Sequence, residues 1–381
     1  MDEYSIETKA IHLSKRLSDK GSLNVPIYQN STFAQVTAGD WEEYTYSRTN
    51  NPTEDALRKV LAELENGSHA VMYSSGLAAI ASVMELLNAG DHVISMADIY
   101  GGTFRFYGES GKRHGLEFSF INTTHLDEVK EAITPSTKMI FVETPSNPQL
   151  QITDLAALSK LAKEHDLLLV VDNTMATPVF QNPLDFGVDI VVHSTSKYIS
   201  GHTNVIGGAT VVNNEKLYDQ LRHIRKATGA SPGPFDCYLT LLGIKTLPLR
   251  MKQHQENAYA VAQFLEKVDG VSNVMYLGLK SHPQYDLMHK QMSGAGGIIS
   301  FEINEESRID TFIKNLELFS LAVSFGSVAS LIDFPAKMSH KDIPTQQRLS
   351  HGVSESMVRL SIGIENKDDL IADLEQAFKG S

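Results

Sequence analysis

Hydrophobic residues recur along the middle of the chain in two alternating spacings. Short, almost wholly apolar runs predict strands buried on both faces, and stretches with apolar positions every three to four residues predict helices. The predicted strands are HAVMY, DHVISM, EFSFIN, KMIFVE, LLLVVD and DIVVHS, at residues 69–73, 91–96, 117–122, 138–143, 167–172 and 189–194. This alternation is typical of βαβ units and predicts an α/β fold with a mostly parallel central sheet.

The pattern changes near both ends of this region. Residues 1–50 carry no clear period, and we expect an irregular arm that contacts a neighbouring subunit. Pro232, Gly233 and Pro234 mark a break, after which a helical stretch of about 236 to 267 contains Pro248 as a kink or boundary. We therefore predict three parts: the arm, a large ligand-binding domain and a smaller C-terminal α+β domain, at residues 1–50, 51–235 and 236–381.

Charge and cysteine content narrow the classes of function. The 33 Lys and Arg against 46 Asp and Glu leave a net charge of −13, which disfavours nucleic acid as a partner. Cys237 is the only cysteine, so neither an intrachain disulfide nor a thiolate-rich metal site can form. The acidic first residues lack the apolar stretch of a secretory signal, and no apolar run is long enough to span a membrane. We expect a cytoplasmic protein without a metal site.

Two common signatures are missing from the sequence. The dinucleotide-binding motif G-x-G-x-x-G does not occur after a strand: Gly76 is not followed by further glycines, and the run that starts at Gly294 lacks the last glycine of the motif. This disfavours a nicotinamide oxidoreductase. There is also no H-E-x-x-H, and the 14 histidines are scattered.

Small and hydroxyl residues follow the strand at 69–73, where Ser74, Ser75, Gly76 and Leu77 open a helix. The free backbone N–H groups and the positive dipole end of a helix N-terminus bind anions. The same residues also make an ordinary helix cap, so an anion site is one of two interpretations.

Polar residues also follow two other strands. Asn147 stands between Pro145 and Pro148, which favours a rigid loop but also fits a plain turn. Asp172 ends an apolar strand, where a carboxylate needs a cation or hydrogen-bond donors to stay charged. It would suit a metal, a ribose hydroxyl or a protonated ring nitrogen, and it could equally be a helix cap.

Lys197 follows Ser194, Thr195 and Ser196 after the strand DIVVHS, and Gly201 comes shortly after it. Most lysines are solvated surface charges. The apolar strand before this lysine and the small residues after it indicate instead that it enters the crevice at the strand ends. A desolvated lysine has a depressed pKa and can form a Schiff base.

An anion cradle, a fixed amide, a buried carboxylate and a lysine together meet the demands of pyridoxal phosphate. Its phosphate needs N–H and hydroxyl donors, its ring nitrogen needs a carboxylate, and its aldehyde needs an amine. The blocks that carry a family resemblance lie in one order along the chain: YSRTNNPT, SSGLAAI, IYGGT, ETPSNP, VVDNT, HSTSKYISGH and VRLSIGIE.

With these blocks the chain resembles the cysteine/methionine-metabolism family of pyridoxal 5'-phosphate enzymes, which includes cystathionine γ-synthases, cystathionine γ-lyases, methionine γ-lyases and O-acylhomoserine sulfhydrylases. The resemblance implies a fold-type I, aminotransferase-like subunit. It also implies a homotetramer, a dimer of dimers with shared active sites.

The resemblance implies a role for each matched residue. Lys197 would form the Schiff base, Asp172 would pair with the ring nitrogen, and Tyr100 would stack on the ring and transfer protons. The implied cofactor-binding residues are Tyr46, Arg48, Ser75, Gly76, Leu77, Tyr100, Asn147, Asp172, Ser194, Ser196 and Lys197, with Tyr46 and Arg48 acting on the neighbouring subunit's phosphate. The implied substrate-binding residues are Asn147, Ser324 and Arg359, with Arg359 as the carboxylate clamp.

Four positions depart from common family patterns. Thr45, Val323 and Ala329 stand where many synthases and cystathionine lyases carry glutamate, and Gly102 stands where methionine γ-lyases tend to carry cysteine. We expect a lyase that cleaves the Cγ–heteroatom bond of a sulfur or homoserine-type amino acid, giving 2-oxobutyrate and ammonia. The alternatives are γ-replacement, as in cystathionine γ-synthase or O-acylhomoserine sulfhydrylase, a γ-lyase acting on a non-sulfur substrate such as canavanine, and a non-catalytic scaffold that kept the fold.

Overall fold

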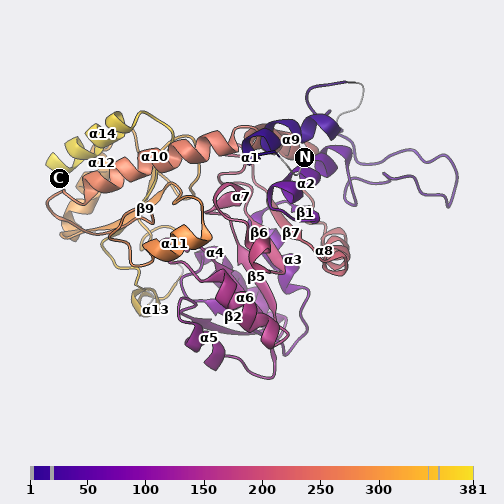
Figure 1. Cartoon of the computed structure of the whole chain (residues 1–381), viewed down its shortest axis with the longest axis horizontal. Helices are drawn as coiled ribbons and strands as arrows, with labels where there is room; N and C mark the ends of the chain where they lie inside the picture. The colour runs from indigo at the N-terminus through magenta and orange to yellow at the C-terminus, as the bar shows by residue number, and fades with distance from the viewer. Residues whose placement is uncertain (1–3, 18–20, 342, 351, 381) are drawn as a thin grey trace.

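The computed structural model describes residues 4–17, 21–341, 343–350 and 352–380, and it is built on two sheets (Figure 1). The larger sheet has seven strands in the order β1-β7-β6-β5-β4-β2-β3. Its strands are β1 His69–Tyr73, β2 His92–Met96, β3 Glu117–Ile121, β4 Thr137–Glu143, β5 Leu168–Asp172, β6 Ile190–His193 and β7 Gly208–Val212. All six predicted strands are therefore present, and β2 to β6 run parallel as expected.

The seventh strand, β7, was not predicted. It pairs antiparallel with both β1 and β6, and so joins β1 to the parallel strands. The sequence there shows a glycine pair before a short apolar run, which resembles a loop. The glycine is required by packing, because a Cβ at Gly208 would lie 2.1 Å from the carbonyl oxygen of Ser75.

Helices cover this sheet, as the alternating pattern predicted. They are α2 Pro52–Leu64, α3 Gly76–Met84, α4 Gly101–Phe106, η2 Tyr107–Gly111, α5 Leu126–Glu131, α6 Leu155–Glu164, α7 Thr177–Phe180, η3 Pro183–Phe186 and α8 Glu215–Thr228. Helices α2 and α8 pack on β1, α3 packs on β6 and β7, and α6 packs on β5. Helix α3, which the sequence predicted to open at Ser74–Leu77, ends at Met84, and the residues after it form tight turns.

The remainder of the chain forms the second sheet and its helices, with strand order β10-β11-β12-β9-β8. The elements are α9 Pro234–Ile244, α10 Leu247–Leu265, β8 Val271–Met275, α11 Tyr285–Gln291, β9 Ile298–Ile303, η4 Glu306–Arg308, α12 Ile309–Asn315, β10 Ser320–Leu321, β11 Leu331–Asp333, α13 Thr345–Ser350, β12 Met357–Ser361 and α14 Lys367–Lys379. The predicted long helical stretch is two helices, with Pro248 in the first turn of α10. Within the described residues, no helix combines the length and apolar character needed to cross a bilayer.

The two sheets draw on separate parts of the chain, residues 69–212 and 271–361. A division into domains near residue 235 remains our proposal.

The arm is less irregular than the sequence indicated. Residues Ile6–His12 form α1, which packs on α10 and α2, and a short helix η1 follows at Ser14–Leu17. The extended segment before α2 projects away from the rest of the chain (Figure 1). Val36 and Trp41 in this segment are 86% and 74% exposed. Contact of this segment with another subunit remains our proposal.

The loop after β6, which carries Lys197, is fixed by α9 and α10. Arg250 of α10 is buried, and its guanidinium donates hydrogen bonds to the carbonyls of Tyr198 at 2.7 Å and Gly243 at 2.8 Å. A Cβ at Gly243 of α9 would lie 2.3 Å from the carbonyl oxygen of Ser200. The helix therefore approaches the Lys197 loop as closely as glycine allows.

We expect Gly243→Ala to destabilise the protein by about 1–3 kcal/mol, because the added methyl group must displace backbone. The matched control is Gly108→Ala, where a Cβ meets nothing within 4 Å. Chemical denaturation of both variants measures the difference. Equal stability of the two variants would contradict the close approach of α9 to the loop.

Candidate active site

Two carboxyl groups end adjacent parallel strands. Glu143 closes β4 and Asp172 closes β5, and the register pairs these residues directly. Burial raises the pKa of the Asp172 carboxyl, against the opposing effect of hydrogen bonds from Thr174. Burial, and next the charge of Asp172, raise the pKa of Glu143 well above its usual value. The pair cannot both ionise cheaply without a cation beside them.

Lys197 lies close to these carboxyls and to the second sheet. Its ammonium Nζ donates to Ser324 Oγ at 2.6 Å and lies 5.0 Å from the centre of the Phe325 ring. Burial, and next the positive charge of Arg359, lower the pKa of Lys197 to about 8. A substantial fraction of this amine is therefore neutral, and nucleophilic, near neutral pH.

Arg359 on β12 links Asn147 and Ser324. It is 2% exposed, and its guanidinium donates to Asn147 Oδ1 at 2.9 Å and to the Ser324 carbonyl at 2.8 Å. Ser324 has a φ of 97°, a conformation that costs a non-glycine residue energy and is concentrated at functional sites. The structure thus brings together four predicted site residues, Lys197, Asn147, Ser324 and Arg359.

A second set of polar residues, which the sequence analysis did not identify, surrounds Arg359 and Asn147: Asp333, Ser339 and His340. Asp333 is 1% exposed and forms an ion pair with Arg359 at 3.4 Å. Ser339 Oγ donates to Asp333 Oδ2 at 2.5 Å, and His340 Nε2 lies 3.2 Å from the Asn147 carbonyl. Burial, and next the charge of Arg359, lower the pKa of His340 to about 4, so this imidazole is neutral.

The predicted anion cradle lies at the start of α3. Ser75 caps the helix by accepting a hydrogen bond from the Ala78 N–H at 3.0 Å. Within the described part of the chain, the backbone N–H groups of Gly76 and Leu77 donate no hydrogen bond to protein. A Cβ at Gly76 would lie 2.7 Å from Ser194 Cβ, so the cradle and Ser194 are in contact.

The other predicted hydroxyl, Ser196, is engaged by backbone. Its Oγ donates to the Gly207 carbonyl at 3.2 Å and accepts from the Gly207 N–H at 2.9 Å. These two bonds close the loop between Lys197 and β7, which leaves Ser196 one lone pair for a ligand.

Tyr100 precedes α4 and is 46% exposed. Its backbone N–H donates to Glu143 Oε2 at 3.2 Å, which ties the loop to the end of β4. A Cβ at Gly102 would lie 2.4 Å from the Tyr100 ring, so glycine at this position lets the ring take its place. Glu143 was not among the predicted site residues, although it opens the ETPSNP block and ends a buried strand beside Asp172.

Tyr46 and Arg48 are not brought to Lys197. The guanidinium of Arg48 donates to the Lys226 carbonyl at 2.7 Å and lies 5.5 Å from the centre of the Tyr46 ring. In the described part of the chain, no hydrogen bond or ring contact joins either residue to the Lys197 cluster, which consists of Lys197, Asn147, Ser324 and Arg359. A role in the neighbouring subunit remains a proposal.

These residues fit pyridoxal phosphate. The carboxyls of Asp172 and Glu143 lie in an environment that favours a cation such as a protonated ring nitrogen. A partly neutral lysine and free N–H groups at a helix start suit an aldehyde and a phosphate.

A model of the family described as Cys/Met metabolism PLP-dependent enzyme matches residues 7–379. The chain belongs to this family. The resemblance drawn from the sequence blocks is thereby confirmed, and with it pyridoxal phosphate as the cofactor and the fold-type I architecture.

Relatives that share this family carry different names. The chain is 46% identical to the cystathionine gamma-lyase of Bacillus subtilis, over 94% of this chain and 95% of that one. It is 44% identical to a cystathionine beta-lyase of Lactococcus lactis, over 98% and 99% of the two chains. The structure of a cystathionine gamma synthase from Xanthomonas oryzae, in complex with aminoacrylate and cysteine, matches with a TM-score of 0.96 at 39% identity and covers 99% and 98%. Overall similarity therefore does not single out one reaction.

The lowered pKa of Lys197 predicts how the cofactor attaches. The neutral amine is the reactive form, so attachment to the apoprotein should accelerate as pH rises, with a midpoint at about 8. Borohydride trapping followed by peptide mapping measures the rate and the site. Arg359→Met should move the midpoint upward, because it removes a positive charge near the amine. A midpoint near the ordinary lysine value, or label on another residue, would contradict this geometry.

Proposed function

We propose that the protein is a pyridoxal phosphate-dependent lyase that cleaves the Cγ–sulfur bond of a cystathionine- or methionine-type amino acid. Water completes the reaction, and the products are a thiol, 2-oxobutyrate and ammonia. The observation that carries the proposal is that Ser324 contacts both Lys197 and Arg359. In addition, the chain has no glutamate at positions 45, 323 and 329.

Bound pyridoxal phosphate supplies an aldehyde that joins an amine and a ring that withdraws electrons from the attached amino acid. Asp172 would hold the proton-bearing ring nitrogen, and the raised pKa of the neighbouring Glu143, caused by burial and by the charge of Asp172, favours its neutral form beside that pair. Lys197 Nζ, as a neutral amine, takes the proton from the substrate Cα. Its hydrogen bond to Ser324 Oγ keeps it within the site.

Arg359 and Asn147 orient the substrate. A substrate carboxylate binds the guanidinium, and Asn147 fixes that guanidinium through its Oδ1. The ion pair with Asp333 holds the Arg359 guanidinium in place and balances its charge while no substrate is bound. Cα then lies toward Lys197, because Ser324 contacts both the lysine and the arginine.

The far end of the substrate meets a less charged environment. Val323 is 58% exposed beside Ser324, and Ala329 is also exposed. A carboxylate at these positions would attract a distal ammonium group, so aliphatic residues relax that requirement. In this proposal the Tyr100 phenol donates a proton to the departing sulfur, and the hydrogen bond from the Tyr100 backbone N–H to Glu143 holds its loop.

The proposed reaction is tested with cystathionine, methionine, homocysteine, O-acylhomoserines and canavanine, each with and without an added thiol. We expect 2-oxobutyrate and ammonia in equal amounts from cystathionine or methionine without a thiol, and no turnover by Lys197→Ala. Products that form only when thiol is present, from an O-acylhomoserine, would identify γ-replacement instead. Pyruvate rather than 2-oxobutyrate would identify β-elimination.

Arg359→Ala should raise KM far more than it lowers kcat. Loss of a charge-assisted, bidentate contact costs about 2–3 kcal/mol, roughly 30- to 150-fold in KM. The matched control is a substrate amide that lacks the carboxylate, for which wild type and variant should differ little. An equal loss with both substrates would show that Arg359 maintains the fold and does not clamp the carboxylate.

A further inference from the structure

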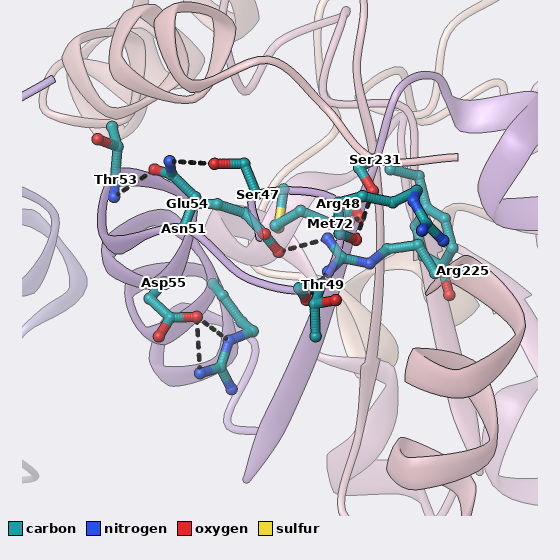
Figure 2. Close-up of polar contacts among 12 residues, drawn as sticks. Ser47, Arg48, Thr49, Asn51, Thr53, Glu54, Asp55, Met72, Arg225 and Ser231 are labelled. Atoms are coloured by element: carbon teal, nitrogen blue, oxygen red, sulfur yellow. Dashed lines mark hydrogen bonds and ion pairs between the residues drawn. The ribbon is translucent and has the colours of Figure 1, made fainter. Parts of the chain in front are cut away.

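A buried ion pair joins α2 to α8 (Figure 2). Arg225 Nη1 of α8 donates to Glu54 Oε1 of α2 at 2.7 Å, and the two residues are 2% and 4% exposed. Burial raises the pKa of Glu54, and the charge of Arg225 opposes this rise. Replacing a buried ion pair by apolar residues is often neutral or stabilising. Stability alone therefore does not account for these two charges.

Arg225 makes a further contact that reaches the arm. Its Nη2 donates to the carbonyl of Thr49 at 2.5 Å, and Nη1 also lies 3.4 Å from the carbonyl of Met72 on β1. Thr49 closes the turn that starts at Tyr46, since its N–H donates to the Tyr46 carbonyl at 2.8 Å. One guanidinium thus holds helix α2, strand β1 and this turn together.

The last turn of α8 and the residues after it hold the same segment at Arg48. Arg48 Nη1 donates to the Lys226 carbonyl at 2.7 Å, and Ser231 Oγ donates to the Arg48 carbonyl at 2.9 Å (Figure 2). The neighbouring Ala230 carbonyl accepts the N–H of Ser74, next to the anion cradle, at 2.9 Å. The arm turn and the chain's own cradle are therefore both attached to one short segment.

We propose that Arg225 is a positioning residue that presents Tyr46 and Arg48 to the cofactor phosphate of the neighbouring subunit. The inference rests on the proposed function and on the expectation, implied by the family resemblance, that Tyr46 and Arg48 act on the neighbouring subunit's phosphate. The Arg225–Thr49 contact fixes the turn before the subunits assemble. The conformational entropy of the turn is therefore lost during folding, and its loss does not weaken cofactor binding. Loss of this contact weakens cofactor binding in the partner and leaves the variant's own cradle intact.

Arg225→Lys tests the contact, because an ammonium retains the charge beside Glu54 and loses the planar fork that also reaches Thr49. The control is Arg58→Lys, whose guanidinium pairs with Asp55 at 3.0 Å on the same helix. We expect the dissociation constant of pyridoxal phosphate to rise at least about tenfold in Arg225→Lys, the loss of one charge-assisted hydrogen bond. Arg58→Lys should stay within about threefold of wild type.

A hybrid oligomer separates action on the partner from action within the chain. One subunit carries Lys197→Ala and the other Arg225→Lys, each with its own affinity tag, so that only the mixed species is purified. The one site with a trappable lysine then receives its arm from a chain with native Arg225. In a dimer of dimers some Arg225→Lys subunits also pair with each other, so borohydride trapping at increasing cofactor concentration should show a population of sites with wild-type affinity in the hybrid and only weak sites in the Arg225→Lys homo-oligomer.

Weak binding in the hybrid would overturn the proposal, since Arg225 would then act on its own cradle. Unchanged affinity in the Arg225→Lys homo-oligomer would overturn it as well. If Arg225→Lys does not fold, Ser231→Ala in the same hybrid design gives a smaller loss in the homo-oligomer and recovery in the hybrid; no loss contradicts the proposal. Absence of trappable cofactor at Lys197 in wild type would refute the proposed function itself, a distinct result.

Discussion

The site depends on ionisable side chains that are buried away from solvent. Asp172 and Glu143 end adjacent strands, and each carboxyl has a raised pKa because of burial. Lys197 has a lowered pKa for the same reason, with Arg359 adding to the effect. Burial thus disfavours the charged form of each group, and a bound ion of opposite charge restores it.

Each of the two sheets contributes part of the site. The parallel strands bring the carboxyls and the Lys197 loop to one edge, and the C-terminal sheet supplies Arg359 and Asp333 from adjacent antiparallel strands. Ser324 joins the halves, with its Oγ on Lys197 and its carbonyl on Arg359. Its positive φ indicates that this bridge is kept at an energetic cost.

Local patterns were sufficient for the strands and for Lys197 and Asp172, because apolar runs mark buried strands and their ends mark the crevice. They were insufficient where tertiary packing determines whether a segment is a strand and where a helix ends. Strand β7 follows glycines that resemble a loop, and α3 stops at Met84 without a breaker in the sequence. Asp333 and Arg225 were missed because single charged residues are ordinarily solvated. Their contacts come from segments distant in sequence, 26 residues apart for Asp333 with Arg359 and 176 for Arg225 with Thr49.

The central claim is that Asp172 is ionised against a protonated ring nitrogen. Solid-state NMR of the protein loaded with cofactor carrying a nitrogen isotope label in its ring reports this protonation directly. We predict the shift of a protonated ring nitrogen throughout the neutral pH range, and the shift of an unprotonated one in Asp172→Asn. An unprotonated ring in the wild-type protein would contradict the account.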